Sequence, residues 1–532
     1  MTSSSVRLHP FSYDPFQQRA MEAIDQGTSV FIAAPTGAGK TVIADYAIEQ
    51  TLRASRRVIY TAPIKALSNQ KFRDFSARHG EHVGIMTGDV TINPTAPLLI
   101  MTTEIYRNTL LEDPGRLSSC LWIIFDEIHY LDDPERGTVW EEAIMFTPDH
   151  INILALSATI PNVEELASWI RDVHHRPVEV IVETNRPVPL HIAFQCQNKL
   201  LETPPDLKRL GYLGRETWSS RRPHGRGRHG IDRWSAHANH LDTLAHHLKE
   251  RQRLPGIFFT FGRRRAEELA WEASRLALVN PAEAARLKEL FNHLCHRYQL
   301  THDHAVSALA HLVERGVAYH HAGMLPTMKE VIEQCFVSRL IKLIVTTETF
   351  ALGINMPARS VIIDNLKKRM EGRIDLIRSR QFHQMAGRAG RRGMDEAGYV
   401  YLRINPQTIT YPEVMRVLHS KPEPIQSRFN TTYATLLNLY RRLGRSLLDL
   451  FPKTLYAFQH SGRQLAAGIL MPKAKVSVVT INLIKRLTKH CSMTSCVCDC
   501  TRGSKASITR PMKTIRATVK DRNSSDMSTA PA

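Results

Sequence analysis

The stretch SVFIAAPTGAGKT, at residues 29–41, decides the fold of this chain. Its apolar start predicts a buried strand, and a helical pattern follows Thr41, so the glycine-rich turn joins a strand to a helix. Small residues let backbone N–H groups curl around phosphate oxygens, and the helix N-terminus adds a favourable dipole. The nucleotide-binding residues expected in this phosphate loop are Thr36, Gly37, Ala38, Gly39, Lys40 and Thr41.

Two side chains of this loop have expected roles toward a nucleoside triphosphate. Lys40 is expected to bridge the β- and γ-phosphates, and the Thr41 hydroxyl is expected to bind Mg²⁺. The strict pattern has Gly where this chain has Ala34, so the loop is a variant. The sequence therefore predicts ATP and Mg²⁺ as cofactors.

A pair of acidic residues follows a second apolar strand, predicted at residues 121–125. In open α/β sheets the loops at the carboxyl ends of the strands form the ligand site. A carboxylate beside a phosphate loop can hold Mg²⁺, so Asp126 is assigned to the metal together with Thr41. A neighbouring carboxylate can orient and deprotonate the attacking water, which makes Glu127 the predicted general base.

Short apolar strands alternate with amphipathic helices along most of the chain, which is typical of parallel α/β domains. Two sets of strands predict two such domains, at residues 1–186 and 187–420. The first set is expected at 29–33, 57–61, 98–102, 122–125 and 151–156. The second set is expected at 257–260, 317–320, 343–346, 361–363 and 399–402.

Two segments of the second domain do not fit the strand pattern. Residues 202–239 are rich in Arg, Gly, Pro and His and predict a flexible basic insertion, which would be a solvated linker or, alternatively, an RNA contact. Residues 281–315 have a helical pattern. His302 and His304 are two residues apart and would lie on different faces of a helix, so they predict no metal site.

The composition changes again in the C-terminal part of the chain. Residues 421–470 predict a mostly helical region, with helices at 433–442, 447–451 and 454–459. Residues 471–532 are rich in Ser, Thr, Lys and Arg and predict a basic, disordered tail. The abrupt change at Met471 also fits a truncation or frameshift of the gene. The spacing of the four cysteines in this tail does not match a zinc knuckle.

The bulk composition restricts the class of protein. A formal charge of +19 indicates a polyanionic partner, although the basic tail contributes to it. The chain is 43% hydrophobic, and no apolar run approaches the roughly 20 residues that a membrane span needs. Residues 1–10 contain no apolar core of a signal peptide. The sequence therefore predicts a cytoplasmic protein with no membrane partner.

Ten short stretches, in order, resemble the DExH-box helicases of superfamily 2, most closely the superkiller-type RNA helicases found with exosome-like RNA decay. They are FSYDPFQ at 11–17, APTGAGKT at 34–41, TAPIKALSNQK at 61–71, TGD at 87–89, TTEIYRN at 102–108, DEIHYLDD at 126–133, SAT at 157–159, YHHAGM at 319–324, TTETFALGINMPAR at 346–359 and QMAGRAGRRG at 384–393. The resemblance implies two tandem RecA-like domains followed by a partial winged-helix-like region. It ends near Gln459, and the family's long helical bundle has no room beyond it, so unwinding is expected to be weak or lost.

The resemblance also implies residues around the nucleotide. Phe11 would stack on adenine, with a core position as the alternative, and Gln17 would read the edge of the base. The residues implied to face the γ-phosphate from the second domain are Gln384, Arg388 and Arg391. The two arginines are three residues apart, about one helical turn, and would point the same way to stabilise the charge of phosphoryl transfer. The next arginine, Arg392, is expected to be solvated.

Further residues are implied to contact the nucleic-acid backbone or to couple the domains. The backbone contacts would come from Pro63, Lys65, Thr87, Gly88, Thr102, Thr103, Gly323, Thr346 and Gly353. Hydroxyls, amides and a lysine suit contacts to phosphates that do not read the bases. Ser157 and Thr159 would couple hydrolysis to domain movement. Residues 367–378 occupy the place of a strand-splitting hairpin, with a plain loop as the alternative.

Taken together, the residues and the resemblance predict an ATP-dependent RNA helicase that moves 3′ to 5′ in RNA processing or decay. Its expected partners are single-stranded RNA or a 3′-tailed duplex and an RNA-decay nuclease complex, and a monomer is expected. Two alternatives stay open at this point. One is a DNA helicase of the repair type, and the other is a nucleic-acid clamp that hydrolyses ATP without unwinding.

Overall fold

The computed structural model describes residues 8–212, 237–276, 278–300, 304–348, 350, 356, 358–370, 372–430, 439–441, 444 and 450–460. All of these residues belong to one compact unit that spans Met1–Gly468. The predicted tail at 471–532, the larger part of the predicted insertion, Gly353 and His302 lie outside the described residues.

The first sheet contains eight strands in the order β4-β3-β5-β2-β6-β7-β1-β8. The strands are β1 (Ser29–Ala33), β2 (Arg57–Ala62), β3 (Val83–Met86), β4 (Thr91–Ile92), β5 (Leu98–Thr102), β6 (Cys120–Asp126), β7 (Asn152–Ser157) and β8 (Val178–Val182). All neighbours pair in parallel except β3 and β4. The five strands predicted for the first domain are confirmed.

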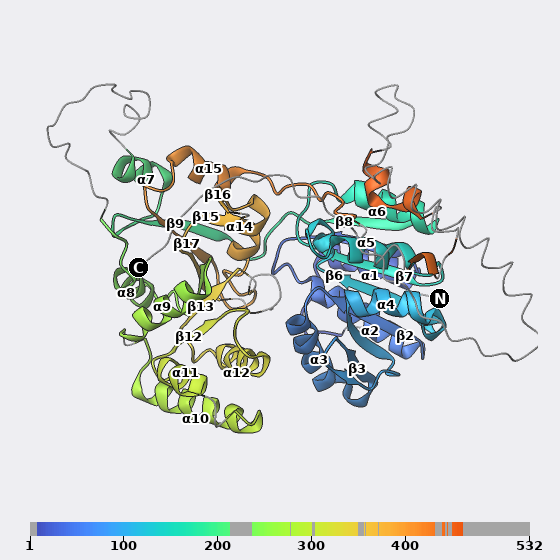
Figure 1. Ribbon diagram of the computed structural model, residues 1–532, viewed down its shortest axis with the longest axis horizontal. Helices are drawn as coiled ribbons and strands as arrows, with labels where there is room; N and C mark the ends of the chain where they lie inside the picture. Colours follow the sequence, from blue (N-terminus) through green and yellow to red (C-terminus); the bar gives the residue numbers. More distant parts are fainter. Residues whose placement is uncertain are drawn as a thin grey trace, which may run out of the picture. The chain divides into compact units, whose positions relative to one another are not determined.

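Helices cover both faces of this sheet, so its central strands are buried on both sides, as parallel strands require (Figure 1). The helices are α1 (Pro15–Asp25), α2 (Lys40–Arg53), α3 (Lys65–His79), α4 (Thr103–Glu112), α5 (Gly137–Phe146) and α6 (Val163–His174). Side chains of α1, α2 and α3 share one core with alternate residues of β1 and β2. On the opposite face Phe125 of β6 packs against Tyr106 of α4 and Trp140 of α5.

The second sheet contains seven strands in the order β10-β9-β17-β14-β11-β13-β12. They are β9 (Leu190–Cys196), β10 (Lys199–Leu201), β11 (Gly256–Thr260), β12 (Val317–His320), β13 (Leu343–Thr347), β14 (Ser360–Ile363) and β17 (Gly398–Ile404). All neighbours pair in parallel except β9 and β10. The second predicted set of strands is also confirmed, and with it the α/β class with two parallel sheets.

The second sheet is accompanied by helices α7 (Pro204–Gly211), α8 (Leu241–Glu250), α9 (Arg263–Ser274), α10 (Pro281–Arg297), α11 (His304–Glu314), α12 (Pro326–Val337), α14 (Ser379–Ala386) and α15 (Tyr411–His419). Helices α10 and α11 confirm the helical pattern at 281–315. The prediction of a flexible insertion from residue 202 is wrong for residues 204–211. The Thr203 side chain accepts a bond from the Asp206 amide, and Leu207 is fully buried, so a capped helix forms there.

A separate two-stranded hairpin joins β15 (Lys367–Met370) to β16 (Arg373–Leu376). The alternative of a plain loop at residues 367–378 is therefore wrong. Gly372 has a φ of 83°, a left-handed conformation that glycine adopts without strain, and it turns the chain between the strands.

After α15 the chain returns to the first domain. Residues 421–430 contain no helix, although they begin the region at 421–470 that the sequence predicts to be mostly helical. The Ile425 amide donates to Asn162 Oδ1 at 2.9 Å, and the Ser427 hydroxyl donates to Glu141 at 2.7 Å. The short helix η5 (Phe451–Lys453) and a helix at 455–460 follow, and the latter confirms the prediction for 454–459.

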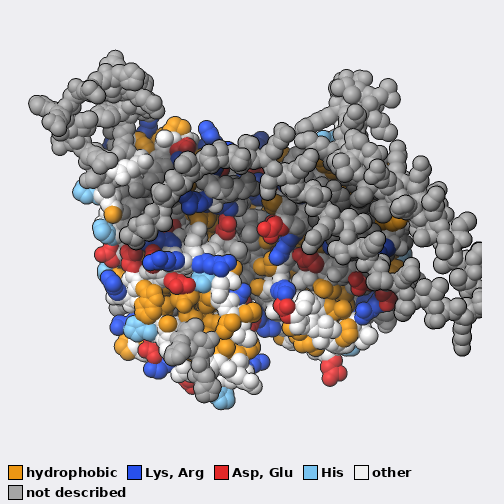
Figure 2. Space-filling model, viewed as in Figure 1, with side chains coloured by type: hydrophobic (Ala, Val, Ile, Leu, Met, Phe, Trp, Pro, Cys, Tyr) orange, Lys and Arg blue, Asp and Glu red, His pale blue; other side chains and the backbone are white. Residues whose placement is uncertain are grey.

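The surface of the second domain combines apolar and basic side chains. Figure 2 shows hydrophobic side chains gathered over its helices, with Lys and Arg side chains along their upper border. Large exposed apolar residues of these helices include Trp271 in α9 and Val337 in α12. Within the described part of the chain, no helix has the length and apolar character needed to cross a membrane.

Candidate nucleotide-binding site

The phosphate loop links the end of β1 at Ala33 to the start of α2 at Lys40. Gly37 and Gly39 have φ angles of 84° and 97°, which a residue with a side chain rarely adopts. A Cβ atom on Gly39 would lie 2.7 Å from Gln17 Nε2, so this position also lacks room for one. The glycines that the sequence assigned to a tight phosphate-binding turn therefore lie where only glycine fits.

The Lys40 side chain bonds back to the start of this loop. Its ammonium donates to the carbonyl oxygens of Ala34 at 2.8 Å and Pro35 at 3.1 Å. Burial lowers the pKa of Lys40, and the carboxylates of Glu127 and Asp126 oppose that shift. A triphosphate bound in the loop would compete with the two carbonyls for the same ammonium.

Asp126 is the last residue of β6, and Tyr60 of the neighbouring strand β2 donates its hydroxyl hydrogen bond to Asp126 Oδ2. Burial raises the pKa of Asp126, and the nearby Lys71 ammonium opposes the shift. Tyr60 is a contact that the sequence analysis missed. It lies in mid-strand, 66 residues from Asp126, and no local pattern connects the two.

Glu127 turns the chain sharply after β6. Its φ is 59° and its ψ is 42°, a left-handed conformation that costs a non-glycine residue about 1–3 kcal/mol. This turn places its carboxylate 3.4 Å from Nδ1 of the buried His129. Asp126 and Glu127 are adjacent in the sequence, but this turn gives their carboxylates different surroundings.

His129 connects Glu127 to the second domain. Gln384 Nε2 lies 2.6 Å from His129 Nε2, and because the amide can only donate there, the ring nitrogen is the acceptor. Burial lowers the pKa of His129 to about 3, so the ring is neutral at physiological pH. Nδ1, which then carries the proton, lies 3.4 Å from a Glu127 carboxylate oxygen without forming a hydrogen bond. The sequence analysis gave His129 no role, although its position two residues after Glu127 was the available signal.

Arg388 is the arginine that the structure brings to this centre. Arg388 is buried, burial lowers its pKa, and the carboxylates of Glu127 and Asp126 oppose the shift. A Cβ atom on the preceding Gly387 would lie 2.9 Å from Thr36 Cβ. The segment that carries Arg388 is thus packed directly on the phosphate loop.

Arg391 is not brought to the same place. Its Nε and Nη2 atoms each lie 2.7 Å from a carboxylate oxygen of Asp395, within the second domain. The argument that Arg388 and Arg391 point the same way assumed a helix, but α14 ends at Ala386. The expectation of shared orientation is therefore wrong, because a turn follows the helix.

Arg392 and Arg186 contact the phosphate loop, and the sequence analysis expected neither contact. Arg392 is exposed, as predicted, but its Nη1 also donates to the carbonyl oxygen of Ala38 at 2.7 Å. Arg186 Nη1 donates to the carbonyl oxygen of Thr36 at 3.0 Å. Arg186 is the last residue of the predicted first domain, and no motif there suggested a contact with a loop 150 residues away.

The expected adenine contacts lie at the N-terminal side of this loop. Phe11 is 45% exposed and stacks on His9 with ring centroids 5.1 Å apart, so the alternative of a core position is wrong. Gln17 is fully buried, and its Nε2 donates to the Gly39 carbonyl at 3.1 Å. Gln17 Oε1 accepts a hydrogen bond from the Asp14 amide at 2.9 Å. These bonds tie the start of α1 to the phosphate loop.

The residues assigned to coupling lie beside the same loop. Ser157 ends β7 and is fully buried, and its carbonyl oxygen accepts a hydrogen bond from the Ala34 amide at 3.2 Å. Thr159 follows in a half-buried position. Because of this hydrogen bond, a movement of this segment would also move the start of the phosphate loop.

Four residues assigned to nucleic-acid contacts gather at one edge of the first sheet, because β2, β5 and β3 are neighbours there. Lys65 pairs with the exposed Asp89 at 2.6 Å, and a Cβ atom on Gly88 would lie 3.4 Å from the Lys65 ammonium. Thr87 Oγ1 accepts a hydrogen bond from the Val90 amide at 3.2 Å. The Pro63 carbonyl accepts a hydrogen bond from Arg136.

The remaining assigned residues lie in different surroundings. Thr102 and Thr103 are buried at the start of α4. Gly323 lies in the loop before α12, where its amide donates to His321 Nδ1 at 3.1 Å. Thr346 is fully buried, and its hydroxyl donates to the His320 carbonyl at 2.7 Å. The expectation that the Thr346 hydroxyl faces nucleic acid is wrong in this conformation, because the hydroxyl is used inside the sheet.

The donors near the phosphate loop fit a magnesium ion that is mainly held by phosphates and water. Mg²⁺ in such sites takes one or two protein ligands. Asp126 at the end of β6 and Thr41 at the start of α2, both half-buried, supply a carboxylate and a hydroxyl. No cluster of three or more His, Cys, Asp or Glu side chains suited to a metal is found among the described residues.

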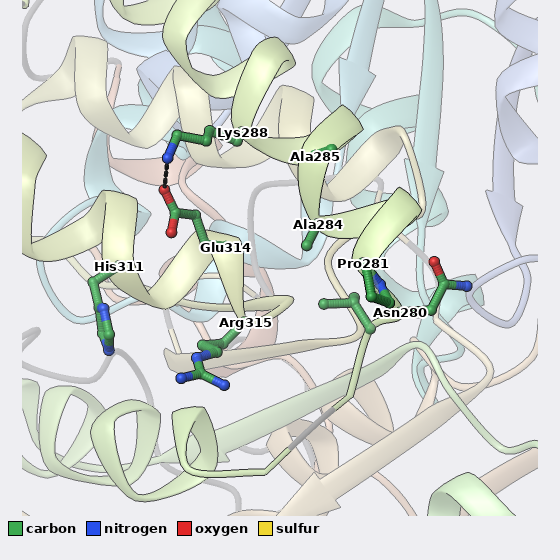
Figure 3. A pocket seen from close by; sticks show the side chains of 9 residues that line it. Asn280, Pro281, Ala284, Ala285, Lys288, His311, Glu314 and Arg315 are labelled. Carbon is green, nitrogen blue, oxygen red and sulfur yellow. Dashed lines mark ion pairs between the residues drawn. The ribbon is translucent and has the colours of Figure 1, made fainter.

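A pocket of about 520 Å³ lies elsewhere, beside α10 and α11 of the second domain (Figure 3). Lys288 and Glu314 point toward one another at its rim and pair at 2.7 Å. Its lining also includes His311 and Arg315, but none of the residues assigned to the nucleotide. It is therefore separate from the phosphate-loop site.

Comparisons with known proteins agree with this arrangement. Residues 14–166 match the DEAD/DEAH box helicase family, and residues 291–393 match the helicase conserved C-terminal domain. The two matches cover the phosphate loop with the acidic pair and the segment with Gln384 and Arg388. They also confirm that the two parallel-sheet domains are a tandem pair of RecA-like helicase domains.

Several curated proteins are similar over most of this chain. Human Superkiller complex protein 2 is 38% identical over 472 residues, which cover 84% of this chain and 37% of that protein. Mouse Exosome RNA helicase MTR4 is 38% identical over 470 residues, which cover 86% of this chain and 44% of that protein. Arabidopsis thaliana DExH-box ATP-dependent RNA helicase DExH9 is 37% identical over 468 residues, which cover 85% of this chain and 47% of that protein. The chain spans less than half the length of each of these relatives. By these matches the chain belongs to the DExH-box helicases, as a homologue of the superkiller and MTR4 proteins.

Proposed function

We propose that this chain hydrolyses ATP between its two RecA-like domains and uses the energy to move along RNA. The observation that carries the proposal is the contact between Gln384 of the second domain and His129, which in turn faces Glu127. Through this contact the second domain reaches the predicted general base of the first. Any shift between the domains would therefore change the surroundings of Glu127.

The positions of the side chains support the proposed catalytic roles. Backbone N–H groups of the phosphate loop and Lys40 bind the phosphates, and Glu127 accepts the proton of the attacking water. Arg388, which is buried, stabilises the negative charge that develops on the transferred phosphoryl group. Asp126 and Thr41 would hold Mg²⁺, which would neutralise phosphate charge. Arg391 is bonded to Asp395 in this conformation, and this bond would have to break before Arg391 could reach the nucleotide.

The proposed substrate is RNA, because the relatives named above are an exosome RNA helicase, a superkiller-complex protein and an ATP-dependent RNA helicase. The formal charge of +19 and the exposed Lys65 beside Gly88 suit a phosphate backbone. We further propose 3′-to-5′ movement, strand separation by the β15–β16 hairpin, a cytoplasmic location and a monomer that joins an RNA-decay nuclease complex.

One experiment tests the reaction and its polymer. ATP hydrolysis by the full chain is measured with RNA, with DNA and with neither, alongside Glu127→Gln. Stimulation by RNA alone, together with loss of turnover in Glu127→Gln, supports the proposal. Stimulation by DNA alone supports a DNA helicase of the repair type. If RNA stimulates hydrolysis but a 3′-tailed duplex is not unwound, the chain acts as a clamp that hydrolyses ATP without unwinding.

A further inference from the structure

The carbonyl side of the phosphate loop is held by side chains from three parts of the chain. Lys40 bonds the carbonyls of Ala34 and Pro35, which belong to the loop itself. The next carbonyl, Thr36, accepts from Arg186, and the carbonyl of Ala38 accepts from Arg392. Two of the three cations therefore come from outside the first domain's sheet.

Arg186 bonds both domains with one guanidinium. Beyond its 3.0 Å bond to Thr36, its Nη2 donates to the carbonyls of Gly387 at 3.0 Å and Ala389 at 2.5 Å, and its Nε donates to Val188 at 2.8 Å. Burial lowers the pKa of Arg186 to about 10, so it stays charged at neutral pH. The planar fork of arginine suits such a set of acceptors, which a single ammonium does not match.

Arg392 makes the second connection, at the other end of the loop. Besides the Ala38 carbonyl, it pairs with the carboxylate of Asp14 at 2.7 Å. A Cβ atom on Gly39 would lie 3.0 Å from Arg392 Nη1, so the guanidinium is packed closely on the turn. The Asp14 amide also donates a hydrogen bond to Gln17 Oε1. Arg392 therefore joins the loop to the expected adenine-binding segment.

All of these acceptors are carbonyls or a carboxylate of the chain itself. Phosphate oxygens are bound by the N–H groups of such a loop, and its carbonyls point away from them. The bonds of Arg186 and Arg392 therefore do not compete with a nucleotide. Lys40 differs, because its ammonium is itself expected to bind the phosphates. Both arginines hold the segment 387–392, and Arg388 lies inside it.

We propose that Arg186 and Arg392 form a clasp that docks residues 387–392 on the carbonyl side of the phosphate loop and so positions Arg388 for the reaction. They are positioning residues, because they contact the backbone and Asp14 rather than the reacting groups. Docking by the clasp does not depend on bound nucleotide. The value of the clasp for catalysis rests on the proposed ATP hydrolysis, but the docking itself does not.

The first test separates turnover from nucleotide affinity. Arg186→Ala and Arg392→Ala are expected to lower the RNA-stimulated kcat by about tenfold or more, while the affinity for a fluorescent ADP changes by less than about threefold. ADP reports the first-domain loop, so a collapsed loop would instead lower its affinity. Arg186→Lys keeps the charge but lacks the fork, and full activity in that variant would overturn the proposal. Thermal melting of each variant verifies folding, and Arg392, whose side chain is 37% exposed, is the variant that perturbs the core less.

The second test measures docking directly, without nucleotide. Arg73 of α3 and Glu330 of α12 form an ion pair between the domains, so Arg73→Cys with Glu330→Cys gives a site for a short bis-maleimide cross-link. The cross-linked peptide, quantified by mass spectrometry, is expected to fall at least about fivefold when Arg186 or Arg392 is also changed to Ala. Arg19→Ala removes an exposed ion pair within the first domain and serves as the matched control.

The two measurements distinguish failure of the clasp from failure of the proposed function. A cross-link that is unchanged in both arginine variants overturns the clasp, even if the chain hydrolyses ATP. A cross-link that depends on Arg186 and Arg392 in a chain without ATPase activity supports docking and overturns the proposed function instead.

Discussion

At the scale of single residues, several groups of the candidate site each meet more than one requirement. Gly39 must accept a left-handed φ and must also leave space for Gln17 and Arg392. Glu127 has a strained left-handed backbone conformation, and this turn separates its carboxylate from that of Asp126. His129, neutral because it is buried, joins Glu127 to Gln384.

The contact between Gln384 and His129 predicts a defect in turnover rather than in binding. Gln384→Ala is expected to lower the kcat of ATP hydrolysis by about 10- to 100-fold with a KM within about threefold of the wild type, because the base loses its link to the second domain. Steady-state kinetics with saturating RNA measure both constants. Gln381→Ala, on the same helix but bonded to Glu348, is the matched control. A raised KM with unchanged kcat would show that Gln384 serves only in binding.

The phosphate loop predicts a defect in binding. Lys40→Ala is expected to abolish tight ATP binding, because the only ammonium bonded within the loop is removed, as far as the described residues show. Titration with a fluorescent ATP analogue measures the affinity, and Lys199→Ala on the exposed strand β10 is the control. An affinity within twofold or so of the wild type would refute the assigned loop.

At the scale of elements, α5 carries two buried acids toward the C-terminal segment. Glu141 Oε2 accepts from the Ser427 hydroxyl at 2.7 Å, and burial raises the pKa of Glu141 to about 7. Burial also raises the pKa of the neighbouring Glu142, which Arg107 opposes. The packing of this helix against residues 427 and 455–456 therefore depends on protonation.

This arrangement predicts a stability that decreases with pH. Because the folded pKa of Glu141 lies above its ordinary value of 4.5, the folded state binds the proton more tightly, and stability falls between pH 4.5 and pH 7. The cost above pH 7 is about 3 kcal/mol at most, from 1.36 kcal/mol for each pKa unit. Glu141→Gln is therefore expected to gain stability relative to the wild type as the pH rises from 5 to 8.

Chemical denaturation of the full chain at pH 5 and pH 8 measures this difference. Glu135→Gln, an exposed acid in the turn before α5, is the control and is expected to show no such trend. If the advantage of Glu141→Gln is the same at both pH values, the carboxylate does not titrate in this range and the prediction is wrong.

At the scale of the whole molecule, one buried carboxylate joins the first domain to two later segments. Asp132 pairs with Arg380 at 3.0 Å and Arg378 at 3.5 Å at the start of α14, and with Arg428 at 2.8 Å in the returning chain. Three guanidiniums on one carboxylate leave the cluster with excess positive charge, so removal of the carboxylate leaves like charges together.

Asp132→Ala is expected to destabilise the folded protein by about 3–5 kcal/mol, the usual cost of breaking a buried ion pair from one side. Because the cluster connects the domains, unfolding is expected to separate into two transitions, which differential scanning calorimetry detects. Asp149→Ala removes an acid that is 79% exposed and is the control. A single transition with an unchanged midpoint would show that the cluster does not stabilise the molecule.

The sequence by itself determined the local features of this protein. The period of apolar residues gave both sets of strands, and the glycines of 37 and 39 together with Lys40 gave the phosphate loop, because these depend on neighbours along the chain. The acidic pair after β6 was predictable in the same way, and the tandem helicase architecture was implied by the resemblance of the ten motifs to a known family. Where a prediction assumed local continuity it failed, as for Arg391, because α14 ends before it.

Only the tertiary structure decided which distant groups meet. Tyr60 reaches Asp126, Arg186 reaches Thr36 and Gly387, and Gln384 reaches His129, over separations of 66 to 255 residues. The buried hydroxyl of Thr346 likewise depends on the pairing of β12 with β13. Such contacts are set by strand order and by the packing of one domain on the other. A linear pattern of residues carries no direct record of either.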